Sequence, residues 1–513
     1  MSPTPTPRHI NLHPENHTPA SLAATTFAVI VLGSGPAGRT LASQTSSAGL
    51  STLIIEAELF GGDCPYWACI PSKALLRPAE SLSASRGLSG ARELISPQPQ
   101  INVQGVFSRR DAFTSRWDDS AIVDISLEQG CTVVRGRGRL LSERTVAVTN
   151  VNGEKVVVAA TQAVVLATGS DPVIRTGASA IAGLSDVPFW TPREATAADM
   201  VPAHLVIVGA GPVGCEMATA YAGFGGRVTL LNASAEILPA LEARAGMIVR
   251  EALRDAGVDV RVSVRATRVR KNADDTVAVE LSDGSVLSGT TLLVAAGRTP
   301  RTREIGLEEL GIKLSSRGRL GVDASLAVKG ASGRWLYAIG DANGLSPTTH
   351  MGSYQARIAA NAIIARAQSP SATAVGSLDT IPWSRFADTA DEKAVSGVIF
   401  TDPNVAYVGL TVAEAEKRGM KVKAVEAEFE FPGAWVHAEF NYKGWANWVV
   451  DTEKKVLVGA TFVGREAADL VHASTVAIVA EIPLDRLRHA VPPFPTVSEI
   501  YTVLFAALDA DRE

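Results

Sequence analysis

Residues 27–38 read FAVIVLGSGPAG, an apolar run that ends in a glycine-rich turn. The run at 27–32 predicts a buried parallel strand, and the turn leads into a helical stretch that reaches about residue 48. A second strand is expected at 51–55, and it ends at Glu56. In such a unit the glycines permit a tight turn and the close approach of a pyrophosphate, whose charge the helix N-terminus favours. The positions expected to contact a dinucleotide are Gly33, Gly35, Pro36, Ala37, Gly38 and, through the ribose, Glu56.

The same pattern recurs at residues 204–214, HLVIVGAGPVG, followed by an expected helix through residue 222 and a strand at 227–231. It predicts a second dinucleotide site. Glu56 follows the first glycine of its turn by 23 residues, and the same distance at the second site leads to Asn232. A carboxylate there favours NAD and a nearby arginine favours NADP, so the choice of nicotinamide stays open. The glycines of the second turn are Gly209, Gly211 and Gly214.

Between the two turns lies the segment 61–73, GGDCPYWACIPSK, which holds Cys64 and Cys69. Two close thiols can cycle between dithiol and disulfide, and two dinucleotide sites imply an electron path from a nicotinamide through a flavin. Attack requires a thiolate, whose formation a helix N-terminus or a nearby cation favours. Pro65 suits a first helical position, which predicts Cys64 at the start of a helix, and Lys73 adds positive potential. We therefore predict a redox-active cysteine pair beside a flavin.

The chain of 513 residues is long enough for about three domains. Its net charge of −5 and pI of 6.0 give no electrostatic reason to expect nucleic acid or an anionic membrane as a partner. The sequence has no run of about 18 apolar residues, so it predicts no membrane-spanning helix. Four cysteines do not make a disulfide framework, and Cys131 and Cys215 stand in apolar surroundings that predict burial.

Residues 1–25 are rich in Pro, Thr and His and lack the apolar stretch of a secretory signal. They also lack the arginine-rich periodicity of a transit peptide. We predict a disordered tail on a cytoplasmic protein.

Three further motifs follow in order, namely residues 167–169 (ATG), 296–300 (AGRTP) and 337–341 (YAIGD). With the two glycine turns and the Cys-x4-Cys-Ile-Pro-Ser-Lys segment, they resemble the class I pyridine nucleotide–disulfide oxidoreductases. This is the family of glutathione reductase, dihydrolipoamide dehydrogenase and mercuric reductase, and the similarity runs from about residue 26 to about residue 505. The resemblance implies FAD as cofactor, NAD(P)H as co-substrate and a homodimer whose active sites are completed across the two-fold axis.

The resemblance also implies an α/β fold with two Rossmann-like dinucleotide-binding domains and a C-terminal α+β dimerisation domain. Residues 400–411, FTDPNVAYVGLT, resemble the start of that last domain. The expected divisions are a tail at 1–25, a first FAD part at 26–185, an NAD(P) domain at 186–297, a second FAD part at 298–378 and a dimerisation domain at 379–513.

The family's roles pass to matching residues of this chain. Cys64 matches the interchange thiol that attacks substrate, and Cys69 matches the thiol next to the flavin. Lys73 matches the lysine beside the flavin N5, and Glu216 matches its ion-pair partner. Asp341 matches the aspartate that holds the ribityl chain. Other positions expected to contact the cofactors are Gly62, Thr168, Gly169, Gly297 and Gly340.

The family's C-terminal motif His-Pro-Thr-x-Ser-Glu reads FPTVSE in this chain, at residues 494–499. Glu499, which would orient the base, is retained, but Phe494 stands at the histidine position and cannot transfer a proton. His489 lies five residues earlier, about 16 Å away in an extended chain, which makes it a poor substitute. His350 matches a position near the flavin and is expected to be structural. A positioned base contributes about 10²–10⁴-fold, so its absence argues against fast reduction of glutathione or lipoamide.

The residues between the cysteines also depart from the family, which usually carries Leu-Asn-Val-Gly where this chain has PYWA. Tyr66 and Trp67 would either alter the approach of the substrate or pack into the first domain, and the sequence leaves both open. Mercuric reductases add a C-terminal cysteine pair. The last cysteine of this chain is Cys215, which disfavours that assignment.

We favour an FAD-dependent NAD(P)H oxidoreductase that passes electrons through Cys64 and Cys69 to a disulfide or another thiol-reactive acceptor. The alternative is a flavoenzyme that bypasses the cysteines and reduces a quinone, a dye or a second nicotinamide, but retention of both cysteines counts against it. The complete set of Lys73, Glu216 and Asp341 disfavours a flavoprotein with only a structural or partner-binding role.

Overall fold

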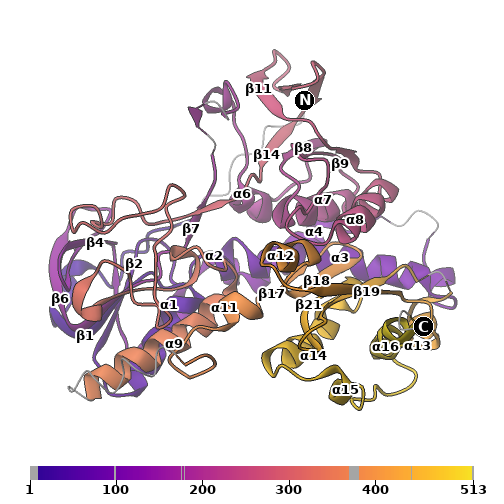
Figure 1. The fold of residues 1–513 in the computed structure, drawn as a ribbon. Helices are drawn as coiled ribbons and strands as arrows, with labels where there is room; N and C mark the ends of the chain where they lie inside the picture. The colour runs from indigo at the N-terminus through magenta and orange to yellow at the C-terminus, as the bar shows by residue number, and fades with distance from the viewer. Residues whose placement is uncertain are drawn as a thin grey trace.

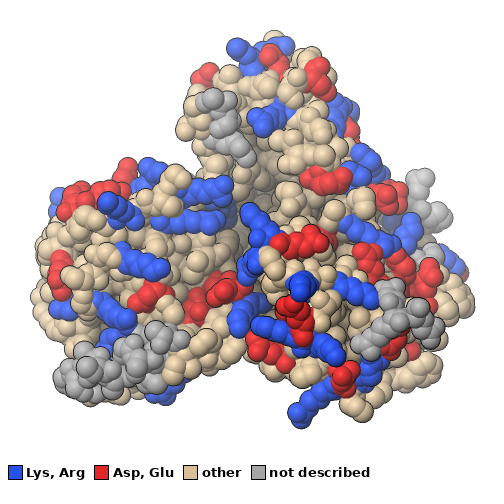
Figure 2. Space-filling model, in the orientation of Figure 1, with Lys and Arg blue, Asp and Glu red and all other residues tan. Residues whose placement is uncertain are grey.

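The computed structural model describes residues 10–96, 100–174, 176–177, 180–368, 381–440 and 442–510. Its sheets and helices are arranged in three lobes (Figure 1). Within these ranges no helix combines the length and the apolar character needed to cross a membrane. On the face drawn in Figure 2, basic and acidic side chains are intermixed.

The first lobe contains a seven-stranded sheet in the order β3-β2-β1-β6-β5-β4, with β16 paired to β6. Strands β3, β2, β1, β6 and β16 are parallel, whereas β4 and β5 form an antiparallel extension. Helices α1 (Pro36–Ser47) and α9 (Thr349–Gln368) pack together against the parallel strands. The strands are β1 (Thr26–Leu32), β2 (Thr52–Glu56), β3 (Thr132–Arg135), β4 (Arg137–Ser142), β5 (Thr145–Thr149), β6 (Lys155–Leu166) and β16 (Leu336–Ala338).

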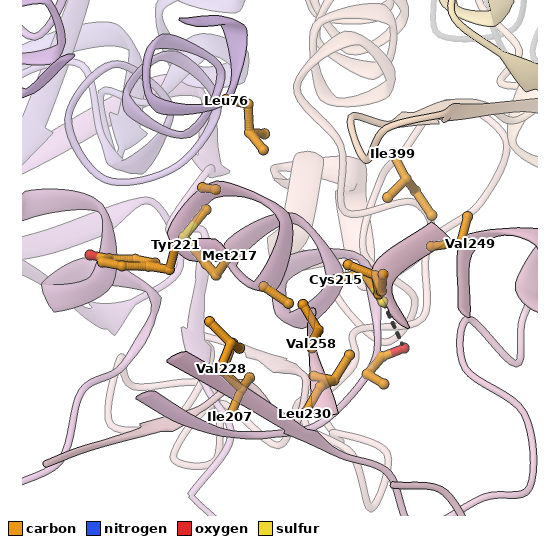
Figure 3. Packing of buried hydrophobic residues seen from close by; sticks show 14 of the residues in the cluster. Leu76, Ile207, Cys215, Met217, Tyr221, Val228, Leu230, Val249, Val258 and Ile399 are labelled. Carbon is orange, nitrogen blue, oxygen red and sulfur yellow. Dashed lines mark hydrogen bonds between the residues drawn. The ribbon is translucent and has the colours of Figure 1, made fainter. Parts of the chain in front are cut away.

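The second lobe contains a parallel sheet in the order β10-β9-β8-β14. Helices α7 (Pro212–Gly223) and α8 (Ala243–Asp255) cover it. Figure 3 shows Cys215 and Met217 of α7 close to Ile207 and Leu230 of the sheet. The two cysteines outside the redox pair, Cys131 and Cys215, are buried as predicted. The strands of this lobe are β8 (His204–Val208), β9 (Arg227–Leu231), β10 (Asp259–Arg261), β14 (Thr291–Val294) and the antiparallel trio β11 (Ala266–Lys271), β12 (Val277–Leu281) and β13 (Val286–Gly289).

The third lobe is an antiparallel sheet in the order β17-β18-β21-β20-β19. Helices α14 (Ala467–Val479) and α16 (Ile500–Ala510) bury their apolar faces on it around Trp448 and Phe462. The mixed α/β fold expected from the sequence is confirmed. The strands are β17 (Ser396–Ile399), β18 (Asn404–Gly409), β19 (Val422–Glu428), β20 (Trp445–Asp451) and β21 (Val456–Gly464).

Helix α3 (Cys69–Gly87) joins the lobes. Its buried residues Leu75 and Leu76 belong to the same core as α7, and a Cβ on Gly223 of α7 would lie 2.7 Å from the Cβ of Ala79. The C-terminal end of α7 therefore packs closely against the middle of α3.

The remaining elements are short. Strands β7 (Ser170–Pro172) and β15 (Arg298–Pro300) pair antiparallel where the chain passes between the first two lobes. The other helices are α2 (Asp63–Tyr66), α4 (Val103–Phe113), α5 (Ser120–Glu128), α6 (Pro192–Ala197), α11 (Ala390–Lys393), α12 (Val412–Lys417), α13 (Pro432–Ala438) and α15 (Leu484–Leu487).

Residues 10–25 correct the prediction of a disordered tail, because they pack on the first lobe. His17 O accepts a hydrogen bond from Arg135 N at 2.8 Å, and Pro19 is buried. The polar composition that suggested disorder is used here for hydrogen bonds to the sheet edge. Residues 1–9 lie outside the described residues.

Candidate active site

The first glycine turn has the geometry expected of a dinucleotide site. Gly33 has φ +104°, and a Cβ there would lie 2.2 Å from Ala167 O. A Cβ on Gly38 would lie 2.0 Å from Gly33 O, so strand and helix touch through their backbones. A Cβ on Gly35 would meet nothing within 4 Å, which leaves open space in front of the N-terminus of α1. This space and the free amides suit a pyrophosphate.

The second turn repeats this geometry. Gly209 has φ +110°, and a Cβ there would lie 2.4 Å from Ala295 O. A Cβ on Gly214 would lie 1.8 Å from Gly209 O, and one on Gly211 would meet nothing within 4 Å. Both turns therefore fit a dinucleotide phosphate.

The residues at the two strand ends are held differently. Glu56 Oε2 accepts from Ser34 N at 2.9 Å and from Ser34 Oγ at 2.7 Å, so its carboxylate faces the first turn. Asn232 is buried, and its Nδ2 donates to Ser234 O at 3.1 Å and to Glu236 O at 2.7 Å. Both amide hydrogens are thereby used, and Oδ1 is left as the acceptor.

Several glycines predicted to contact the cofactor converge on the start of α1. Gly62 has φ +69°, and a Cβ there would lie 2.9 Å from Gly35 Cα. Gly340 has φ +62°, and its Cβ would lie 3.4 Å from the Cβ of Ala37. The predicted Thr168-Gly169 and Gly297 positions flank the adjoining crossing, where Arg301 N donates to Gly169 O at 2.9 Å and Val173 N donates to Gly297 O at 2.9 Å.

The cysteine pair lies on two successive helices. Helix α2 begins at Asp63, so Cys64 lies in its first turn as predicted, but this helix has only four residues. The chain then bends at Ala68, and the long helix α3 begins at Cys69. The partial positive charge of a long helix therefore acts on Cys69.

Both thiols are free in the structure, and their pKa values are shifted in opposite directions. A hydrogen bond from Cys64 lowers the pKa of Cys69 to about 6, against the opposing effect of burial, with help from Thr349 and Lys73. Cys69 Sγ lies 3.2 Å from Thr349 Oγ1 at the start of α9. The same hydrogen bond raises the pKa of Cys64, and burial raises it further. The pair therefore carries its negative charge on Cys69.

One ion pair joins all three lobes beside the cysteines. Lys73 Nζ of α3 lies 2.8 Å from Glu216 Oε2 and 3.0 Å from Oε1. Glu216, on the first turns of α7, also accepts from Phe400 N at 3.0 Å. The ring of Phe400 lies under Lys73 Nζ, 4.8 Å from it to the centroid. Lys73 and Glu216 thus form the ion pair that the resemblance to the family implied.

Asp341 belongs to a polar network that sequence reasoning did not find. Ser170 Oγ donates to Asp341 Oδ2, and Arg298 Nε donates to Ser170 Oγ at 2.7 Å. Arg298 Nη2 also donates to Asp63, the residue before Cys64. Arg193 pairs with Asp63 from the other side at 3.4 Å. Arg298 lies within the 296–300 motif, but its partners come from separate elements, so spacing could not reveal them.

A cavity of about 220 Å³ adjoins this network. Its charged lining pairs three guanidinium groups with three carboxylates. These residues are Arg193, Arg298, Arg301, Glu58, Asp63 and Asp171.

Two family descriptions match the chain. Pyridine nucleotide-disulphide oxidoreductase matches residues 27–363, and the dimerisation domain of the same family matches residues 395–504. The chain belongs to the pyridine nucleotide-disulphide oxidoreductase family. Family members use FAD and NAD(P)H, so the predictions of enzyme class and cofactors are confirmed, and the second match supports a homodimer.

The relatives of this oxidoreductase include a dihydrolipoyl dehydrogenase of Rhizobium etli, 29% identical over 505 residues, with 95% of this chain and 98% of the relative covered. A mercuric reductase of Staphylococcus aureus is 25% identical over 492 residues, with 95% and 83% covered.

Two solved structures share the fold. One is the Cu(II) complex of the HOCl-induced flavoprotein disulfide reductase RclA from Escherichia coli, with TM-score 0.76, 22% identity and 94% and 99% of the two chains covered. The other is LpdA from Mycobacterium tuberculosis, with TM-score 0.75, 24% identity and 95% and 100% covered.

The aromatic residues in the redox loop of this oxidoreductase are buried, which decides between the two readings of the sequence. Tyr66 is 2% exposed, and its hydroxyl donates to Phe60 O at 3.0 Å. Trp67 is 6% exposed and lies 5.8 Å from the ring of Trp117. Arg193 covers the Trp67 ring at 4.8 Å. These rings pack into the first lobe and expose no face on which a flat acceptor could stack.

The C-terminal motif of the oxidoreductase has no proton carrier at residue 494. Phe494 is 72% exposed on the chain. Glu499 Oε1 accepts from Thr496 N at 3.0 Å, so this carboxylate caps its own turn. His489 is exposed, and His350 Nε2 donates to Ser396 O at 2.8 Å, which ties α9 to β17.

Proposed function

We propose that this oxidoreductase passes electrons from NAD(P)H through FAD and the Cys64–Cys69 pair to a disulfide or another thiol-reactive acceptor. The observation that carries the proposal is the asymmetry of the pair. Cys69 has a pKa of about 6 at the start of a long helix, whereas the pKa of Cys64 is raised. A thiolate held beside Thr349 and Lys73 can accept the proton of Cys64, which must itself become a thiolate before it attacks the acceptor.

The steps follow from these protonation states. Cys64 gives its proton to Cys69 and, as a thiolate, attacks one sulfur of the acceptor disulfide. The departing thiolate takes that proton from Cys69 and leaves as the first thiol, so that Cys69 is again a thiolate. Cys69 then attacks the Cys64 sulfur, which releases the second thiol and closes the Cys64–Cys69 disulfide. Bound FAD supplies the two electrons from NAD(P)H that return the pair to the dithiol. The balance is NAD(P)H + H⁺ + RSSR → NAD(P)⁺ + 2 RSH.

Other residues would hold the cofactors during these steps. Lys73, fixed by Glu216, would face the flavin, and Asp341 would bind its ribityl chain. Glu56 would accept from the adenosine ribose of FAD. Without a base at residue 494, proton transfer depends on the pair itself, which we expect to slow turnover by about 10²–10⁴-fold relative to a reductase with a positioned histidine.

Replacing Cys64 with Ser tests the proposal most directly. We expect NADH- or NADPH-dependent reduction of a small aromatic disulfide to fall at least about 10³-fold, because a serine hydroxyl is not ionised at neutral pH. Flavin content serves as the control for folding. Undiminished disulfide turnover in this variant would remove the proposed role of the pair.

A second candidate is direct reduction of a quinone or dye by the flavin. The absence of a proton carrier at Phe494 favours it, because such acceptors need no thiol chemistry. The two candidates separate in the Cys69→Ala variant. Direct transfer predicts that quinone turnover persists there, and transfer through the pair predicts that it is lost together with disulfide turnover.

We further propose NADH as the donor. Asn232 Oδ1 is the free acceptor at the end of β9, and it can accept from a ribose hydroxyl but not from a phosphate oxygen. One such hydrogen bond contributes about 0.5–1.5 kcal/mol, so we expect kcat/KM for NADH to exceed that for NADPH by about two- to tenfold. A preference for NADPH would contradict the assignment.

We propose that the enzyme acts in the cytoplasm as a homodimer, in which the C-terminal motif of one chain faces the cysteine pair of the other. Recovery of the enzyme in the soluble cytosolic fraction, at twice the mass of the chain, is the expected result.

A further inference from the structure

Residues 10–25 precede β1 and lie before residue 27, where the family match begins. We call this segment the strap. Three of its contacts with the first lobe belong to the surroundings of the FAD site or of the redox loop.

The first contact lies beside the predicted ribose carboxylate. His13 Nδ1 donates to Ala57 O at 3.0 Å. Ala57 follows Glu56 directly, and Glu56 is bound to Ser34 in the glycine turn. The hydrogen bond from His13 therefore fixes the backbone next to the adenosine end of the site.

The second contact completes the hydrogen bonding of a buried guanidinium. Arg135 at the end of β3 donates from Nη1 and Nη2 to Asp119 at 2.8 and 3.0 Å, and both side chains are buried. Arg135 Nε donates to Asn16 Oδ1 at 2.7 Å. Asn16 of the strap thus supplies the hydrogen-bond acceptor that Nε of this buried guanidinium would otherwise lack.

The same buried pair reaches the loop that carries the cysteines. Asp119 Oδ2 also accepts from Phe60 N at 2.7 Å, and Phe60 lies directly before the Gly61-Gly62 turn. A displacement of Arg135 would therefore also displace the backbone at Phe60, four residues before Cys64.

The third contact is apolar. Ile10 and Leu12 pack against a cluster of four buried side chains. Its members are Leu59, Tyr66, Trp67 and Trp117. Tyr66 and Trp67 lie between the cysteines in the sequence, where the family has smaller residues. These two aromatic residues and the strap therefore form one packing unit.

We propose that the strap is a positioning element of the redox centre, which holds the adenosine end of the FAD site and the Cys64–Cys69 loop in one rigid unit. The part that concerns the cysteine pair rests on the proposed function. The part that concerns FAD retention does not.

Variants of Asn16 test the adenosine end in the full chain, because Arg135, which Asn16 accepts from, lies opposite Glu56 across the β2–β3 pair. Asn16→Ala removes the acceptor of Arg135 Nε, and we expect FAD to dissociate about three- to tenfold faster in a mild chaotrope. Asn16→Asp keeps an acceptor for the guanidinium and should retain the wild-type rate. Release is followed by the rise of flavin fluorescence.

Variants of Leu12 test the redox end. Leu12→Ser weakens packing on the Tyr66–Trp67 rings, and we expect the long-wavelength thiolate–flavin absorption of the reduced enzyme to fall about twofold or more at equal flavin content. Leu12→Met conserves volume and should restore it. Val151→Ser is the matched control, because Val151 is 65% exposed in the same lobe and should leave both readouts unchanged.

Wild-type FAD release in Asn16→Ala, or wild-type absorption in Leu12→Ser, would overturn the proposal, even if either variant unfolded at a lower temperature. Equal effects in the conservative variants would overturn it as well. If the wild-type enzyme itself shows no long-wavelength absorption, the proposed function fails, and the Asn16 variants still decide the role of the strap at the FAD site.

Discussion

The inner and outer halves of the redox centre differ in how much of the family's machinery surrounds each cysteine. Cys69 starts a long helix, touches Thr349 and lies near the Lys73–Glu216 ion pair. Cys64 lies in a four-residue helix, and Phe494 stands where the resemblance to the family implies a base for it. In the proposed mechanism, stabilisation of a thiolate at Cys69 and proton transfer to the acceptor are therefore separable, and this chain keeps the residues for the first without a base for the second.

Replacing Phe494 with His should change activity most, because it would supply the base that the outer half of the redox centre lacks. A base facing Cys64 in the homodimer could accept its proton, and we expect kcat/KM for a disulfide acceptor to rise about 10–100-fold in Phe494→His. The gain should stay below the full contribution of a positioned base, because Glu499 caps its own turn instead of orienting residue 494.

Phe494→Tyr is the matched control, since it keeps the ring without a base that titrates near neutral pH. An unchanged rate in Phe494→His would show that the missing base does not limit turnover.

Replacing Glu216 tests the inner half of the redox centre, which holds Cys69 and the Lys73–Glu216 ion pair. Glu216→Ala leaves Lys73 without its partner and Phe400 N without its acceptor, and we expect a loss of about 1–3 kcal/mol in stability. Glu216→Gln still accepts from Phe400 N and should lose less. The measurement is the unfolding temperature of the FAD-loaded enzyme, with the exposed Glu251→Ala as control, and equal unfolding temperatures would refute the role of this pair in joining the lobes.

The acidity of Cys69 gives the smallest of these effects. Because its pKa is lowered to about 6, the thiolate and its absorption band should persist from pH 8 down to about 6 and fade as Cys69 becomes protonated below that. Thr349→Val removes a hydrogen bond that lowers this pKa, so the midpoint should rise by about 0.5–1 pH unit. A titration of the reduced enzyme measures it, and a midpoint near the ordinary thiol value in the wild type would contradict the assignment.

Much of the fold could be predicted because its signals are local. The strands at 27–32 and 204–208, and the glycines that follow them, are read from short segments whose geometry depends on neighbours in the chain. By contrast, the sequence did not reveal that the helix at Cys64 has only four residues and that a long helix begins at Cys69 after the bend at Ala68, which no composition rule foretells.

The sequence by itself determined the two glycine turns and the pair of cysteines, since each follows from residue type and spacing, and its resemblance to the family implied the loss of a base at Phe494. Only the tertiary structure decided that Cys69 and not Cys64 begins the long helix, that Tyr66 and Trp67 are buried, and that residues 10–25 bind Arg135. These outcomes depend on contacts between residues far apart in the chain. Burial and hydrogen bonding across such distances are set by how the lobes pack, and a linear pattern does not carry that information.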